Sequence, residues 1–187
     1  MTDRSKKDSQ AVLERIAFCF PAPQGLPFPV KPGRGSANDL RQIQSLDWNS
    51  ILEGRNVELI RSGAFWLYGF LEESHVIAQG IHTAEGSYWH GLMHRSEADF
   101  SNSMYWFRRV GKHDIFPDLL EAVKSLEPTS KSREEVLKAL RSLSAWEPQW
   151  LVDLCEEGYR GRFKDLDLIQ QIAAIEYNIL MKYCLER

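Results

Sequence analysis

The sequence predicts an all-α protein, a single-domain helical bundle of about seven or eight helices. Segments after Ser36 repeat apolar residues at three- and four-residue spacing, which is typical of amphipathic helices, and no convincing set of alternating strands occurs. The chain has 187 residues, of which 43% are hydrophobic, so it is long and apolar enough to bury one core.

The N-terminal part is expected to be the least regular. Residues 1–10 are charged and predict a flexible tail, and residues 11–187 are expected to form the single helical domain. A short amphipathic helix is predicted from Ala11 to Phe20. The next segment, Pro21 to Gly35, reads "PAPQGLPFPVKPGRG", and its prolines and glycines predict a loop, which could cover a pocket as a lid.

Capping residues and glycines divide the remaining sequence into helices. Serine, asparagine and aspartate favour helix starts, and glycine favours helix ends. The predicted helices are Ser36 or Asn38 to Leu46, Asn56 to about Gln79, Gly86 or Ser87 to Glu97, Asp99 or Ser101 to Arg109 with an end near Gly111, Phe116 to Leu126, Ser132 to Leu143, Pro148 to Glu157, and Asp165 to Leu185.

Composition argues against several classes of function. The net charge of -3 and a pI near 6.0 predict no general affinity for nucleic acid or for anionic membranes. No apolar run approaches the roughly 20 residues of a membrane span. Cys19, Cys155 and Cys184 are scattered and form no CxxC pair, so neither a disulfide framework nor a zinc ribbon is expected. A reducing, cytoplasmic setting fits this cysteine usage.

A polar stripe in the segment "WHGLMHRSEADF" is the first candidate site. His90, His94 and Glu97 are spaced i, i+4, i+7, which at 100° per residue confines them to an arc of about 60° on one helix face. Two imidazoles and a carboxylate form a donor set that zinc, iron or manganese commonly takes. The spacing lacks the glutamate of an HExxH motif, so this is not a zincin pattern.

A second stripe precedes it. Glu72, His75 and Gln79 share one face of the preceding predicted helix. A Glu-x-x-His pair is used by di-iron carboxylate proteins, which carry it twice, whereas only one copy occurs here. The connection at residues 80–86 is short enough to set the two helices antiparallel, so that the two stripes could face one another.

A third candidate lies in the last predicted helix. Glu176 falls within the apolar face of "LDLIQQIAAIEYNILMKYC". Burial of an unpaired carboxylate costs several kcal/mol, so Glu176 should meet a histidine, an arginine or a metal, or stay protonated.

The segment "YWFRR" is the candidate for substrate binding. Tyr105 and Trp106 could line a cavity, and Arg108 or Arg109 could clamp a carboxylate or phosphate. A packed helix with a solvated basic edge explains the same residues. Aromatic and basic residues also mark single-stranded nucleic-acid binding, but the acidic chain argues against it. Asn102 is expected only to cap the helix start.

The blocks "SHVIAQ", "WHGLMHR" and "YWFRRVGKH" resemble an uncharacterised family of soluble bacterial and fungal proteins. The resemblance covers approximately Leu67 to Phe116. It implies no ligand, substrate or catalytic role. It implies that one recurring unit contains Ser74, His75, Gln79, Trp89, His90, His94, Arg95, Glu97, Asp99, Asn102, Tyr105, Trp106, Arg108, Arg109 and His113.

The leading hypothesis is a metal-dependent enzyme, a hydrolase or an oxidoreductase, that acts on a small anionic molecule between helices. The candidate ligands of zinc, iron or manganese are Glu72, His75, His90, His94, Glu97 and Glu176. One alternative is a cofactor-free enzyme with a histidine base beside a buried glutamate. The other is a metal-free binding or scaffold protein in which the same cluster is structural.

Overall fold

The structure, a computed structural model, describes residues 29–54 and 56–187. This part of the chain contains ten helices and no strand, which confirms the all-α class and exceeds the expected seven or eight helices. The predicted tail at residues 1–10 and the predicted helix from Ala11 to Phe20 lie outside the described residues. None of the described helices combines the length and the apolarity needed to cross a membrane.

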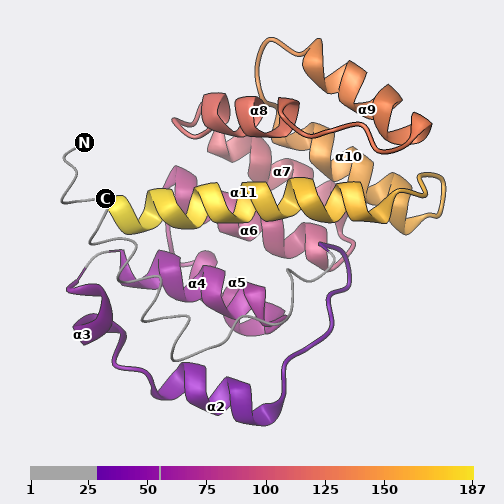
Figure 1. Ribbon diagram of the computed structural model, residues 1–187. Coiled ribbons are helices and arrows are strands. Elements are labelled where there is room, and N and C mark those ends of the chain that lie inside the picture. The colour runs from indigo at the N-terminus through magenta and orange to yellow at the C-terminus, as the bar shows by residue number, and fades with distance from the viewer. Residues whose placement is uncertain (1–28, 55) are drawn as a thin grey trace.

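The helices follow one another through short connections (Figure 1). They are α2 (Ala37–Ser45), α3 (Trp48–Leu52), α4 (Val57–Leu67), α5 (Leu71–Ala78), α6 (Ala84–Ser96), α7 (Phe100–Val110), α8 (Phe116–Lys124), α9 (Lys131–Arg141), α10 (Pro148–Tyr159) and α11 (Leu166–Glu186).

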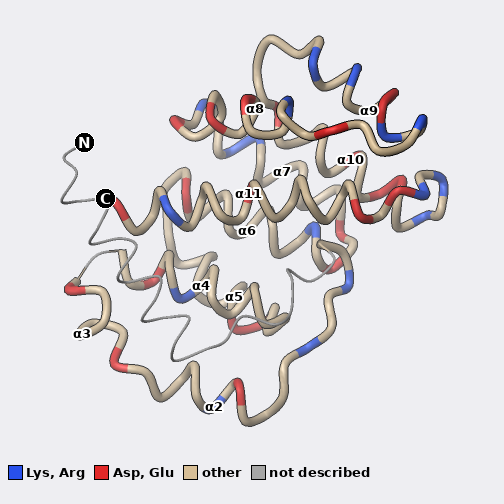
Figure 2. The backbone as a smooth tube through the Cα atoms, in the orientation of Figure 1, with Lys and Arg blue, Asp and Glu red and all other residues tan. Residues whose placement is uncertain are grey.

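Helix α6 lies at the centre of the bundle. It packs against α4, α5 and α7, and every residue from Gly86 to Ser96 is buried. The long helix α11 crosses the bundle and packs against α4, α8 and α10 (Figure 1). Helices α8 and α9 form an outer layer that carries charged residues of both signs (Figure 2). Residues Gly86 to Ser96 of α6 are therefore surrounded by other helices and not by solvent.

The predicted long helix from Asn56 to about Gln79 is wrong, because the structure divides it into α4 and α5. Helix α4 ends in a Schellman motif, in which the amide of Phe70 donates to Phe65 and the amide of Gly69 donates to Trp66, both at 2.9 Å. Gly69 has φ +69°. A Cβ there would lie 2.2 Å from the carbonyl oxygen of Gly33, so the break also admits the segment before α2. Helix α5 consequently folds back against α4.

Other helix boundaries agree more closely with the sequence. Asp99 caps α7 by accepting from the amide of Asn102 at 3.2 Å, and α7 ends at Val110, before Gly111, as predicted. Helix α6 begins at Ala84, earlier than expected, because the hydroxyl of Thr83 accepts from the amide of Gly86. The five-residue helix α3 was not predicted from the sequence.

Candidate metal centre

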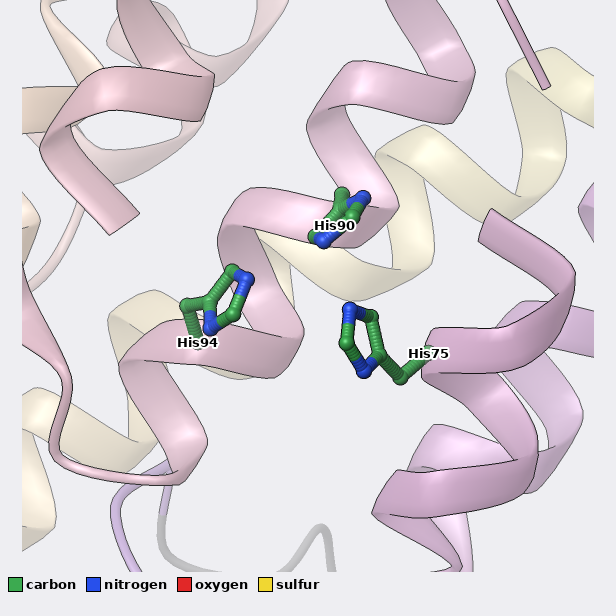
Figure 3. A group of neighbouring side chains, drawn as sticks. All are labelled: His75, His90 and His94. Atoms are coloured by element: carbon green, nitrogen blue, oxygen red, sulfur yellow. The ribbon is translucent and has the colours of Figure 1, made fainter. Parts of the chain in front are cut away.

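Three histidines from two helices converge between α5 and α6. His75 belongs to α5, and His90 and His94 are one turn apart on α6. One ring nitrogen of each lies within 4.8 Å of those of the other two. Figure 3 shows His75 across from α6, with the three rings turned toward one shared space. The structure thus brings His75, one residue of the second predicted stripe, to His90 and His94 of the first, and this group could hold a metal ion.

Packing against α7 fixes this face of α6. The carbonyl of Gly91 accepts from the hydroxyl of Ser103 at 2.8 Å. A Cβ at Gly91 would lie 3.2 Å from the ring of Phe107, so glycine allows the two helices to approach closely. In this antiparallel register Trp106 stacks on His90, with 3.8 Å between ring centroids and 13° between ring planes. The α7 helix therefore forms one wall of the histidine cluster.

The environment favours neutral imidazoles. The exposed fraction of His90 is 3%, and burial, followed by the nearby His94 and His75, lowers its pKa from 6.5 to about 3. Burial also lowers the pKa of His94, with a further contribution from His75. Glu97 and Asp99 oppose that shift. A neutral imidazole keeps a lone pair, which is the form that binds a metal.

Polar groups surround His94 on both ring nitrogens. The Oε2 atom of Glu97 is 3.4 Å from Nδ1, and Oδ2 of Asp99 is 4.0 Å from the same nitrogen. The side-chain nitrogen of Asn102 lies 3.1 Å from Nε2 and 3.4 Å from Nδ1. Glu97 therefore stands beside the histidine cluster, outside the group of three converging nitrogens.

The histidine cluster fits a metal ion in two respects. The buried Nδ1 atom of His90 has no hydrogen-bond partner among the described residues, which is costly for a polar atom removed from water. When three nitrogens bind one tetrahedral metal, each at a metal–nitrogen distance of about 2.0–2.1 Å, the nitrogens lie roughly 3.3 Å from one another. The three ring nitrogens, which lie within 4.8 Å of one another, would have to move closer by side-chain rotation to reach that spacing.

The structure does not bring two of the predicted ligands to this cluster. Glu72 is exposed on α5 and does not belong to the converging group. Glu176 accepts from Nη2 of Arg95 at 2.5 Å and from the hydroxyl of Tyr88 at 3.0 Å. The sequence predicts that Glu176 needs a partner, and Arg95 is that partner. The predicted role of Glu176 as a metal ligand is wrong, because its carboxylate is paired with Arg95 away from the histidine cluster.

Of the predicted substrate-binding residues, Trp106 contacts the cluster, and Tyr105 and Arg109 contact Trp106. The guanidinium of Arg109 is 5.2 Å from the ring of Trp106 and 5.9 Å from that of Tyr105. Its Nη1 donates to the hydroxyl of Tyr105 at 3.4 Å. Arg108 and Arg109 are exposed, and neither forms an ion pair within residues 29–54 and 56–187. These cations are thus available to an anionic ligand.

Asn102 is the site residue whose place the sequence did not predict. Asn102 and Trp106 are spaced i, i+4 on α7, which is the spacing of His90 and His94 on α6. That shared spacing could have indicated two facing stripes. The pairing itself depends on the register of α6 against α7, which a single sequence does not reveal.

No family model matches the chain, and no curated protein or solved structure is similar enough to it to count as a match. The resemblance of approximately Leu67 to Phe116 to a bacterial and fungal family stays a prediction.

Proposed function

We propose that the protein is a cytoplasmic, metal-dependent enzyme that acts on a small anionic molecule at a centre formed by His75, His90 and His94. The observation that carries the proposal is the convergence of three ring nitrogens within 4.8 Å of one another, from two helices. The buried Nδ1 of His90, which has no hydrogen-bond partner among the described residues, is compatible with a metal ligand, but the buried Nε2 of His113 outside the cluster lacks a partner too, so the convergence of the three nitrogens is the stronger observation.

Zinc and iron are the candidate metals that a three-histidine donor set favours, since imidazole nitrogen suits both. Manganese, the third candidate, prefers oxygen ligands. A metal held by three imidazoles would supply Lewis-acid or redox chemistry at positions left open to substrate or water. Hydrolysis and oxidation are both compatible with this donor set, and the identity of the bound metal would separate them.

The chain's own residues would bind and orient the substrate. Arg109 is held over Trp106, and Trp106 in turn stacks on His90, so an anionic group bound by Arg109 would lie beside the cluster. Arg108 is a second exposed cation on α7. A guanidinium preordered by stacking loses less conformational freedom when it binds a carboxylate or a phosphate.

Elemental analysis of protein purified without chelator, after supplementation with zinc, iron and manganese, tests the metal centre. We expect near-stoichiometric metal in the wild type and its loss in His90→Gln/His94→Gln. The matched control is His113→Gln, which replaces a histidine that is also buried but lies outside the group of three. Metal-free wild-type protein, or equal metal in all three proteins, would contradict the proposal.

A structural role is the second candidate, favoured by the ring packing within the cluster. His90 stacks on Trp106, and its ring also lies 4.8 Å from that of His94, at an interplanar angle of 21°. If packing is the only role, His90→Gln/His94→Gln should lower the free energy of unfolding equally with and without added metal. The cofactor-free enzyme stays an alternative, and it would need a glutamate other than Glu176, whose carboxylate is paired with Arg95.

A further inference from the structure

We propose that Glu97 is a positioning residue of the metal centre, because its carboxylate holds the Nδ1 proton of His94 and so directs the Nε2 lone pair of that ring toward the metal. The inference rests on the proposed function. It gives Glu97 a role different from the direct coordination that the sequence predicts.

The contact between Glu97 and His94 defines which nitrogen carries the proton. Oε2 of Glu97 lies 3.4 Å from Nδ1 of His94. A carboxylate only accepts hydrogen bonds, so a hydrogen bond across this contact is donated by Nδ1. A neutral imidazole has one N–H, and Nε2 is then the nitrogen with the free lone pair.

Two further residues agree with this tautomer. The side-chain nitrogen of Asn102, which is a donor, lies 3.1 Å from Nε2 and 3.4 Å from Nδ1, so while no metal is bound it can donate to the lone pair of the nearer nitrogen, Nε2. Oδ2 of Asp99 lies 4.0 Å from Nδ1 and adds negative charge on the side where the proton is held. Three side chains around one ring thus favour the same tautomer.

The position of Glu97 suits a supporting role. It is the C-cap residue of α6, three residues after His94, so the carboxylate and the imidazole are carried by the same turn. Its side chain is 39% exposed, and the converging group comprises only the three histidines among the described residues. A carboxylate that accepts the second N–H of a ligating histidine fixes the ring orientation and raises the basicity of the ligating nitrogen.

The first measurement reads the tautomer directly. Long-range ¹H–¹⁵N NMR of metal-free protein distinguishes a protonated Nδ1 from a protonated Nε2 on an assigned histidine. We expect the Nδ1–H form of His94 in the wild type and in Glu97→Gln, whose amide oxygen can still accept. In Glu97→Ala the Nε2–H form should grow. Glu72→Ala, at an exposed glutamate of α5, is the matched control and should match the wild type.

The second measurement reads the metal. Titration with Co²⁺, followed by visible absorption, gives both an affinity and the coordination environment. We expect Glu97→Ala to bind about 10- to 100-fold more weakly than the wild type, which is the usual effect of removing such a partner. The shape and intensity of the Co²⁺ bands should be unchanged. Glu97→Gln should recover most of the affinity, and Glu72→Ala should bind as the wild type does.

The outcomes separate this inference from the proposed function. Wild-type affinity in Glu97→Ala, or an Nε2–H tautomer in the wild type, overturns the positioning role and leaves the three-histidine centre standing. Co²⁺ bands that change in Glu97→Ala make Glu97 a ligand and overturn it too. If the wild type binds no Co²⁺, Zn²⁺, Fe²⁺ or Mn²⁺, the proposed function fails, and the positioning role fails with it.

Discussion

Arg95 of α6 and Glu176 of α11 form a buried ion pair, with 2.5 Å between Nη2 of Arg95 and Oε2 of Glu176. Neither side chain has exposed surface. Tyr88, two turns earlier on α6, donates to the other carboxylate oxygen at 3.0 Å. Burial, together with the charge of Glu176, raises the pKa of Tyr88 well above 10, so it remains a donor. At about 100° per residue, Arg95 and Tyr88 lie on a different side of α6 from His90 and His94, roughly 130° around the helix. The ion pair therefore fixes the rotation of α6 that points the histidines toward α5.

Removing one partner of this pair should be strongly destabilising. We expect Glu176→Leu or Arg95→Met to lower the free energy of unfolding by about 3–5 kcal/mol, because each leaves an uncompensated buried charge. The double variant should recover most of the loss. Glu58→Gln, which breaks the exposed Glu58–Arg61 pair, should cost less than about 1 kcal/mol. Urea unfolding of the wild type and of these four variants measures the losses. If the single core variants lose as little stability as Glu58→Gln, the buried ion pair does not have the expected weight.

Gly69→Ala should destabilise the α4–α5 turn. The new Cβ would lie 2.2 Å from the backbone of Gly33, at a residue with φ +69°, so we expect a loss of about 1–3 kcal/mol. Gly80→Ala is the matched control, because its Cβ would meet no atom closer than 3.5 Å. Thermal unfolding should show a lower Tm for Gly69→Ala alone. Equal Tm values would mean that the close approach to Gly33 is easily relieved.

The stability of the metal-free protein should fall as the pH drops below 6.5. The pKa of His90 is about 3 in the folded protein and ordinarily 6.5, so between these values the unfolded chain binds a proton that the folded protein excludes. The contribution of neutral His90 to the free energy of unfolding is fully present above pH 6.5. It declines toward pH 3 by about 1.4 kcal/mol per pH unit for each proton that only the unfolded chain binds. Urea unfolding at several pH values, with chelator present, gives the free energy of unfolding as a function of pH. The slope of this dependence below pH 6.5 should be shallower for His90→Gln than for the wild type. Parallel slopes would show that His90 is not the group responsible.

Anion binding should depend on Arg109. Titration with inorganic phosphate, followed by NMR of the Trp106 indole N–H, should shift that signal in the wild type, since Arg109 lies over the Trp106 ring. Loss of a charged hydrogen bond costs about 1.5–3 kcal/mol, so Arg109→Gln should weaken binding by roughly 10- to 100-fold. Arg162→Gln, at an exposed arginine paired with Glu157, should bind as the wild type does. An unchanged affinity in Arg109→Gln would remove Arg109 from the anion site.

Local periodicity was sufficient to predict the helical class and the stripe of His90, His94 and Glu97, because neighbours on one helix face are fixed by the 3.6-residue turn. The rest depends on distant contacts. The break at Gly69 depends in part on the backbone of Gly33, and the partner of Glu176 is 81 residues away. Asn102 faces His94 through the register between two helices. None of these pairings follows from spacing within one segment.

The complete burial of α6 has a consequence for mutational tolerance. A substitution from Gly86 to Ser96 must be accommodated by a neighbouring helix, so random libraries directed at α6 should yield few folded variants. His75 on α5, Asn102 and Trp106 on α7, and Glu97 at the C-cap are all partly exposed. These positions around α6 are the practical starting points for varying the proposed metal centre and substrate site.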